Sequence, residues 1–187
     1  MILSILIPTL LSRQQQFQTL KAHLEAQIQN NRLTGLVEII PLPNNGKGSS
    51  IGQLRNELMQ LATGSHIIFL DDDDWVNSKY VVSIFAAIQY HNPDVVTFKG
   101  WMTTDGKSRV NFTIKLGEDY VERGGVYYRY PNHLCAIRKS IAMKVPFQNI
   151  RHQEDYNFAT ALKNKGLLKT EVHIDEELYH YRFITNK

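Results

Sequence analysis

His66-Ile-Ile-Phe-Leu70 is followed directly by four aspartates, Asp71 to Asp74, and this pair of runs points to both architecture and chemistry. The apolar run is typical of a strand that is covered on both faces in a parallel sheet. Four adjacent carboxylates repel one another, and burying any of them without a partner is costly. We therefore predict that a buried strand ends at Leu70 and that the acidic run lies where a ligand binds.

Two similar apolar runs precede this strand. Residues Ile2 to Ile7 are apolar except for Ser4, and half of them are isoleucine; Pro8 ends the run. Residues 36–42 are predicted to form a second buried strand. With a helix predicted after each, the first 70 residues have the order strand–helix–strand–helix–strand. This order predicts an α/β fold with right-handed crossovers and a mostly parallel central sheet.

The two predicted helices begin at capping boxes. Ser12 with Gln15 and Ser50 with Gln53 have the spacing at which each side chain caps the backbone of the other. Gly64 is predicted to end the second helix as its C-cap.

The second half of the chain is less regular. We predict one domain over residues 1–187, in which about residues 1–100 hold the parallel units and about residues 101–187 form a smaller mixed or antiparallel portion. The hairpin turn of this portion is predicted at Asp105-Gly106. The predicted helices are 78–90 and 154–163, and the predicted strands are 94–100, 110–114, 127–130, 133–137, 171–174 and 178–183.

Composition excludes several classes of protein. Of the 187 residues, 43% are hydrophobic and 21% are charged, which excludes a disordered chain. The net charge of +3 permits an acidic partner such as a nucleotide without demanding a nucleic acid. The single cysteine, Cys135, excludes an internal disulfide and a cysteine-rich zinc site. No apolar run reaches the roughly 18 residues that cross a bilayer, so we expect a soluble, cytoplasmic protein without an integral membrane segment.

Polar residues follow each of the three predicted strands: Pro8-Thr9, Asn44-Asn45 and the acidic run. In such sheets, ligands bind beyond the carboxyl ends of the strands, so we expect all three to meet at one crevice. Clustered carboxylates suit a hard divalent cation, which takes one or two of them together with substrate phosphates. The alternative for the acidic run is a solvated turn that supplies one helix cap.

Two further groups are candidates for the site. Arg55 and Asn56 lie one turn inside the second helix, whose N-terminus favours anions; the alternative for Arg55 is a surface cation. Glu154 and Asp155 open a later helix. There they either serve its dipole or supply a general base that reaches an acceptor hydroxyl. Phosphate-loop, EF-hand, paired-histidine zinc and Gly-x-Ser-x-Gly motifs are absent from the sequence.

Five segments in this order resemble the family 2 glycosyltransferases: Ser4-Ile-Leu-Ile-Pro-Thr9, Arg55-Asn56, Ala62-Thr-Gly64, Ile67-Ile-Phe-Leu-Asp-Asp-Asp-Asp-Trp75 and Gln153-Glu-Asp155. The resemblance covers most of the chain, and residues 55–75 are its most specific part. It implies a GT-A fold in which about residues 1–100 bind a nucleotide sugar and about residues 101–187 hold the acceptor and the catalytic base.

The resemblance also implies roles for single residues at the donor. The donor, for which a UDP-sugar is favoured, would contact Pro8, Thr9, Asn44, Asn45, Arg55, Asn56, Asp71 and Asp72. Asn44 and Asn45 stand where many members have an acidic residue that recognises uracil.

Metal binding and catalysis are implied for the remaining candidates. Asp73, the last residue of the Asp-x-Asp pattern, would bind Mn²⁺ or Mg²⁺, with Asp71 at the ribose or a metal-bound water. His180 would add a metal ligand or an acceptor contact. Asp155 would be the general base, with Glu154 as the alternative, in one in-line displacement that inverts the sugar.

The acceptor hydroxyl would belong to a glycan, a lipid-linked saccharide, a protein or a nucleic acid. Its site would be built from about residues 100–150, from a second copy of the chain in a homo-oligomer, or from a partner. Two other functions remain open. One is a non-catalytic module that binds a nucleotide or a nucleic acid. The other is a nucleotidyltransferase, although only Arg13 lies in the loop where that class carries its basic residues.

Overall fold

The computed structural model of the protein describes residues 1–44, 48–150 and 152–185. The strands are β1 (Leu3–Leu10), β2 (Val37–Asn44), β3 (His66–Phe69), β4 (Trp75–Val76), β5 (Val95–Thr104), β6 (Lys107–Ile114), β7 (Val121–Arg123), β8 (Val126–Arg129), β9 (Ala136–Arg138) and β10 (Glu171–Phe183). The helices are η1 (Leu11–Arg13, a 3-10 helix), α1 (Gln14–Asn30), α2 (Ile51–Leu61), α3 (Tyr80–His91), α4 (Lys139–Ala142) and α5 (Glu154–Asn164).

The strands form one mixed sheet in the order β2-β1-β3-β9-β5-β6-β8-β7, and β10 pairs with β5 and β4. β1 is parallel to both β2 and β3, so that Leu6 lies between Ile40 and Phe69. β9 is antiparallel to β3 and β5 and joins this parallel part to the antiparallel hairpin of β5 and β6. The predicted α/β class, with a parallel first part and a smaller mixed part, is confirmed.

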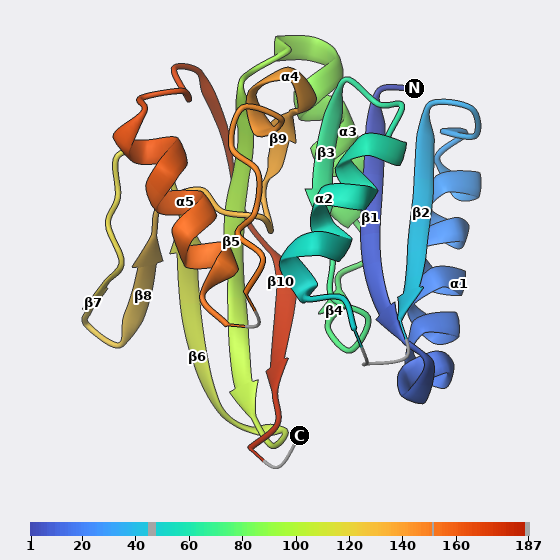
Figure 1. Ribbon diagram of the computed structural model, residues 1–187, viewed down its shortest axis with the longest axis horizontal. Coiled ribbons are helices and arrows are strands. Elements are labelled where there is room, and N and C mark those ends of the chain that lie inside the picture. The colour runs from blue at the N-terminus through green and yellow to red at the C-terminus, as the bar shows by residue number, and fades with distance from the viewer. Residues whose placement is uncertain (45–47, 151, 186–187) are drawn as a thin grey trace.

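Helices cover both faces of the sheet. Figure 1 shows α2 and α5 in front of it and α3 behind it. α2 contacts β1, β2 and α5, whereas α1 packs on α3. β1 is buried along nearly its whole length because helices lie on both of its faces. This explains why its sequence is a continuous apolar run rather than an alternating one.

The capping box at α2 is confirmed, and the one predicted at α1 is wrong. Ser50 Oγ accepts a hydrogen bond from Gln53 N at 3.1 Å, and Gln53 Oε1 accepts one from Ser50 N at 3.0 Å. At the other helix the chain first forms η1, and α1 begins at Gln14 without a side-chain cap among the described residues. The backbone N–H of Leu10 is bound by an aspartate of the acidic run instead.

Gly64 is not a helix cap. α2 ends at Leu61, and Gly64 is absent from the glycines with positive φ. A Cβ atom on Gly64 would lie 2.7 Å from Ser4 Oγ and 2.8 Å from Ser4 N. The position therefore requires glycine because β1 passes too close for any side chain.

The second half differs from the prediction mainly in its strands. The two predicted strands 171–174 and 178–183 are one strand, β10, with register shifts between Ile174 and Glu177 and between Glu177 and Tyr179. The short elements β4, β7 and α4 were not predicted. Cys135 is buried, and burial raises the pKa of its thiol to about 12, which suits a packing residue. Within the described ranges, no helix has the length and apolarity needed to cross a membrane.

Candidate active site

The polar residues at the carboxyl ends of β1 and β2 and the acidic run after β3 meet at one cavity of about 490 Å³, which we call the first compartment. β1 contributes Pro8 and Thr9, and β2 contributes Asn44. The N-terminal part of α2 and the acidic run complete its walls. Asn45 lies outside the described residues. The prediction that these segments meet at the carboxyl ends of the strands is therefore confirmed for the residues that the structure describes.

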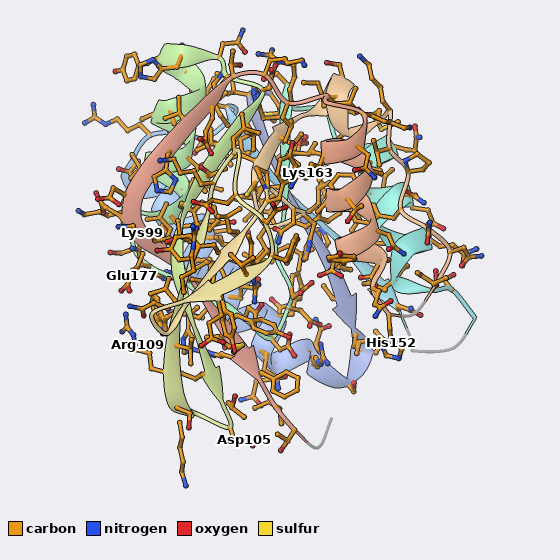
Figure 2. The ribbon with its side chains drawn as sticks, turned by 90° about the vertical axis from the view of Figure 1, so that its left-hand side faces the viewer. Lys99, Asp105, Arg109, His152, Lys163 and Glu177 are labelled. Carbon is orange, nitrogen blue, oxygen red and sulfur yellow. The ribbon has the colours of Figure 1, made fainter. Side chains whose placement is uncertain are left out.

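A second cavity of about 440 Å³, the second compartment, opens beside the first. The two share Arg55, Asp71, His152, Glu154 and Tyr181, so they form one continuous crevice. The remaining wall of the second compartment comes from the N-terminus of α5, from β8, from the loop before β7 and from the segment before β9. Figure 2 shows His152 on the side of the molecule opposite Lys99, Arg109 and Glu177, which lie on the other face of the sheet.

The four aspartates divide into two pairs. Asp72 and Asp74 are both buried. Asp72 accepts hydrogen bonds from Leu10 N at 2.8 Å and Arg13 Nη1 at 2.9 Å. Asp74 accepts hydrogen bonds from the Tyr179 hydroxyl at 2.6 Å and from a backbone N–H of β10. Burial raises the pKa of both carboxyls, against the effect of these bonds. This pair ties the loop to β1 and β10.

Asp71 and Asp73 are the more exposed pair, and both line the first compartment. Asp71 Oδ1 lies 3.2 Å from Arg55 Nη2, and Asp73 Oδ2 lies 3.1 Å from Arg13 Nη1. The part of the chain that the structure describes contains no group of three or more His, Cys, Asp or Glu arranged to hold a metal. Two carboxylates are nevertheless the set that a small octahedral cation uses when substrate phosphates and water complete its shell.

Arg55 joins the two compartments. It is 3% exposed, so the alternative of a surface cation is wrong. Its Nη1 donates to Glu154 Oε1 at 2.6 Å, and its guanidinium packs against the rings of Phe69 and Phe147, at 5.8 and 5.5 Å from their centroids. Burial raises the pKa of Glu154, and the charge of Arg55 opposes this shift. Arg55 therefore links α2, the acidic run and α5.

Asp155 occupies a different environment from its neighbour Glu154. Its side chain is 43% exposed and lines the second compartment, and its Oδ2 lies 3.9 Å from His133 Nδ1. Gln153, which precedes the pair, has φ of +66°, a left-handed conformation that is uncommon for a residue with a side chain. Backbone strain of this kind concentrates at functional sites.

Two of the candidate residues do not join the crevice. Asn56 clamps the backbone of Phe147: its Nδ2 donates to the carbonyl at 2.9 Å, and its Oδ1 accepts from the N–H at 2.9 Å. His180 stacks on Trp101 at 4.8 Å, and its Nε2 is 2.8 Å from Thr103 Oγ1. Because side chains alternate along a strand, Tyr181 lines the crevice and His180 faces away. The metal-ligand role expected for His180 is corrected accordingly.

Several residues of the crevice were not candidates from the sequence. The sequence around Tyr181 and Tyr120 contains no motif that marks a binding site. Both residues reach the crevice only because the fold brings β10 and the loop before β7 there. Arg129 is one of many scattered basic residues, and its position is set by the pairing of β8 with β6. Arg13 also lines the first compartment. Its position shortly after β1 is a sequence feature that could have identified it as a residue of the crevice.

The model of glycosyl transferase family 2 matches residues 19–160, which include Arg55, the acidic run and Asp155. The chain belongs to this family. The match confirms the family expected from the sequence motifs.

Solved structures agree in fold. S. aureus TarS 1–349 in complex with UDP-GlcNAc superposes with a TM-score of 0.68 at 14% identity, over 100% of this chain and 60% of that chain. The complex of the same protein with UDP gives a TM-score of 0.66 at 17% identity, over 97% of this chain and 60% of that one. This family member therefore has the expected GT-A fold and spans about 60% of the length of those structures. No curated protein matches the chain.

Proposed function

We propose that this family member transfers a sugar from a nucleoside diphosphate sugar to an acceptor hydroxyl. The observation that carries the proposal is the division of the crevice. An ion-paired first compartment at the strand ends meets, at Arg55 and Asp71, a second compartment that holds an exposed carboxylate, Asp155. A donor and an acceptor bound in adjoining compartments would meet at this shared wall.

The donor fits the first compartment. Pro8, Thr9 and Asn44 lie where the base would bind, and the Asn44 amide offers both a donor and an acceptor for pairing with it. The diphosphate would lie toward Arg55 and the acidic run. A UDP-sugar is favoured, which agrees with the UDP-GlcNAc and UDP bound to the structurally similar TarS. Asp72 would act indirectly by holding Arg13 in the compartment wall.

Asp71 and Asp73 would hold Mn²⁺ or Mg²⁺ together with the diphosphate. The cation, when bound, supplies positive charge that offsets the charge of the leaving nucleoside diphosphate. Their two carboxylates face the compartment in which we place the donor, and this is the support for the assignment.

Asp155 is the better general base of the two acids at α5. Glu154 is buried and bound to Arg55, so it already has a partner for its charge. Asp155 is partly exposed in the second compartment and can accept the proton of an acceptor hydroxyl. The oxygen would attack the anomeric carbon opposite the departing nucleoside diphosphate. One such displacement inverts the configuration of the sugar.

The first test measures UDP binding and UDP-sugar hydrolysis with Mn²⁺ or Mg²⁺ in the wild type, Asp73→Asn and Asp155→Asn. We expect UDP to raise the melting temperature in a metal-dependent way. Asp73→Asn should lose this stabilisation. Asp155→Asn should keep UDP binding while the rate of release of UDP from the sugar donor falls by about 10²- to 10⁴-fold.

Asp175→Asn is the matched control, because Asp175 pairs with Lys99 on the other face of the sheet and should change neither quantity. Metal-dependent UDP binding without any donor hydrolysis would instead favour a non-catalytic binding module. Absence of stabilisation by every nucleoside diphosphate tested would overturn the assignment of the first compartment.

A further inference from the structure

Resting on the function proposed above, we propose that the acceptor carries an oxyanion, a phosphate or a carboxylate, which Arg129 binds in the second compartment while the reacting hydroxyl lies at Asp155. Three features of the described part of the compartment carry this inference: an arginine without a carboxylate partner there, a buried imidazole nitrogen without a hydrogen bond there, and the charges that surround them.

Arg129 ends β8 and lines the second compartment. Its guanidinium lies 5.2 Å from the centroid of the Phe112 ring, and among the residues that the structure describes no carboxylate lies within ion-pair distance of it. Arg13 and Arg55, at the first compartment, each contact two carboxylates. A guanidinium fork binds a carboxylate or phosphate in a bidentate manner, so Arg129 retains the capacity that the other two have used.

His133 presents the second unpaired group. Its side chain is 6% exposed, and its Nδ1 has no hydrogen-bond partner within the described part of the chain. The 3.9 Å to Asp155 Oδ2 is too long for a hydrogen bond. Burial, with the nearby charges of Arg55 and Arg129, lowers the pKa of His133, so its ring is neutral near pH 7. A buried polar atom without a partner is costly, and a bound ligand can supply that partner.

The surrounding charges determine the orientation of the acceptor. Asp71, Glu154 and Asp155 face the same compartment and would repel an oxyanion placed beside them, although Arg55 offsets the first two. Arg129 is the cation on the β8 side, so the oxyanion would bind there. The neutral hydroxyl would then lie toward Asp155. An acceptor without an anionic group would leave Arg129 uncompensated in a compartment partly closed to water.

The test is an NMR titration of the protein saturated with UDP and Mg²⁺, so that the first compartment is filled. Glucose, glucose 6-phosphate and glucuronate are added separately to the wild type, Arg129→Gln, Arg129→Lys and Arg123→Gln. In the wild type we expect one or both anionic sugars to bind about tenfold tighter than glucose, the size of one charged hydrogen-bonded contact. The tighter of the two identifies the oxyanion as phosphate or carboxylate.

Arg129→Gln should reduce this preference to less than about twofold, and Arg129→Lys should retain part of it because the charge remains. Arg123 lies on the adjacent strand β7 and is paired with Glu118, so Arg123→Gln should keep the full preference. Equal binding of all three sugars to the wild type would overturn the inference, as would equal weakening of all three in Arg129→Gln. Saturation with UDP is measured first, so its failure would count against the proposed function instead.

Discussion

The two compartments of the crevice use charge in opposite ways. In the first, Arg13 contacts Asp72 and Asp73, and Arg55 contacts Asp71 and Glu154. In the second, Asp155 is partly exposed. Among the described residues, Arg129 packs on the Phe112 ring without a carboxylate partner, and the Nδ1 atom of His133 has no hydrogen-bond partner. The first compartment is thus organised by contacts that exist without a ligand, whereas the second leaves groups that a ligand can satisfy.

This difference distinguishes residues that stabilise the site from residues that are available to bind a ligand. Ion pairs between buried groups are sensitive to the loss of either partner, because the remaining charge is left in a poorly solvated place. Polar groups that have no partner until a ligand binds contribute little to the free energy of unfolding, or lower it. Substitutions in the two compartments should therefore differ in both size and sign.

The largest effect on stability is expected for Arg55→Met. The methionine can keep the apolar packing against Phe69 and Phe147, but Glu154 loses its partner. We expect the free energy of unfolding to fall by about 3–5 kcal/mol in urea denaturation. Arg123→Met is the control, since its ion pair with Glu118 is on the surface and should be worth about 0–1 kcal/mol. Similar losses of unfolding free energy in both variants would show that the ion pair between Arg55 and Glu154 contributes no more to stability than a surface pair.

A pH dependence of intermediate size is expected from His133. Because burial lowers its pKa in the folded protein, the unfolded chain binds the extra proton below its ordinary value of 6.5. The contribution of His133 to stability is therefore complete above that pH and decreases as the pH falls. Relative to His133→Asn, the wild type should lose up to about 2 kcal/mol of unfolding free energy between about pH 7.5 and pH 5. A difference between the two proteins that does not vary with pH would contradict the buried, neutral imidazole.

The smallest effects, of opposite sign, are expected at the two helix N-termini that border the crevice. Ser50→Ala removes the cap of α2 and the hydrogen bond to Asn149, and should lower the free energy of unfolding by about 1 kcal/mol. Gln153→Gly, at the left-handed N-terminal position of α5, should cost nothing or stabilise by about 1 kcal/mol, because glycine adopts that conformation without strain. Losses of equal size at both positions would contradict the strain assigned to Gln153.

Much of the first half could be predicted from local patterns. Continuous apolar runs indicate strands that are buried on both faces, and Ser50 with Gln53 marks the beginning of α2 through bonds between near neighbours. The family resemblance implied that the acidic run, Arg55 and Glu154 belong to one site, but not that Arg55 pairs with Asp71 and Glu154. Predictions failed where the local pattern had a distant cause. Gly64 is required by the close approach of Ser4, and near the start of α1 the backbone N–H of Leu10 donates to the distant Asp72 rather than to a local cap.

Periodicity and spacing thus determined the α/β class, the parallel strands and the position of the crevice, because each depends on residues close in the chain or on the shared ends of parallel strands. Only the tertiary structure decided that Asp72 and Asp74 are buried, that Arg55 is buried, and that Tyr181 rather than His180 lines the crevice. Those outcomes depend on the pairing of β10 with β4 and β5 and on the packing of α5 against α2. A shift of one residue in such a pairing would reverse the side chains that face the crevice.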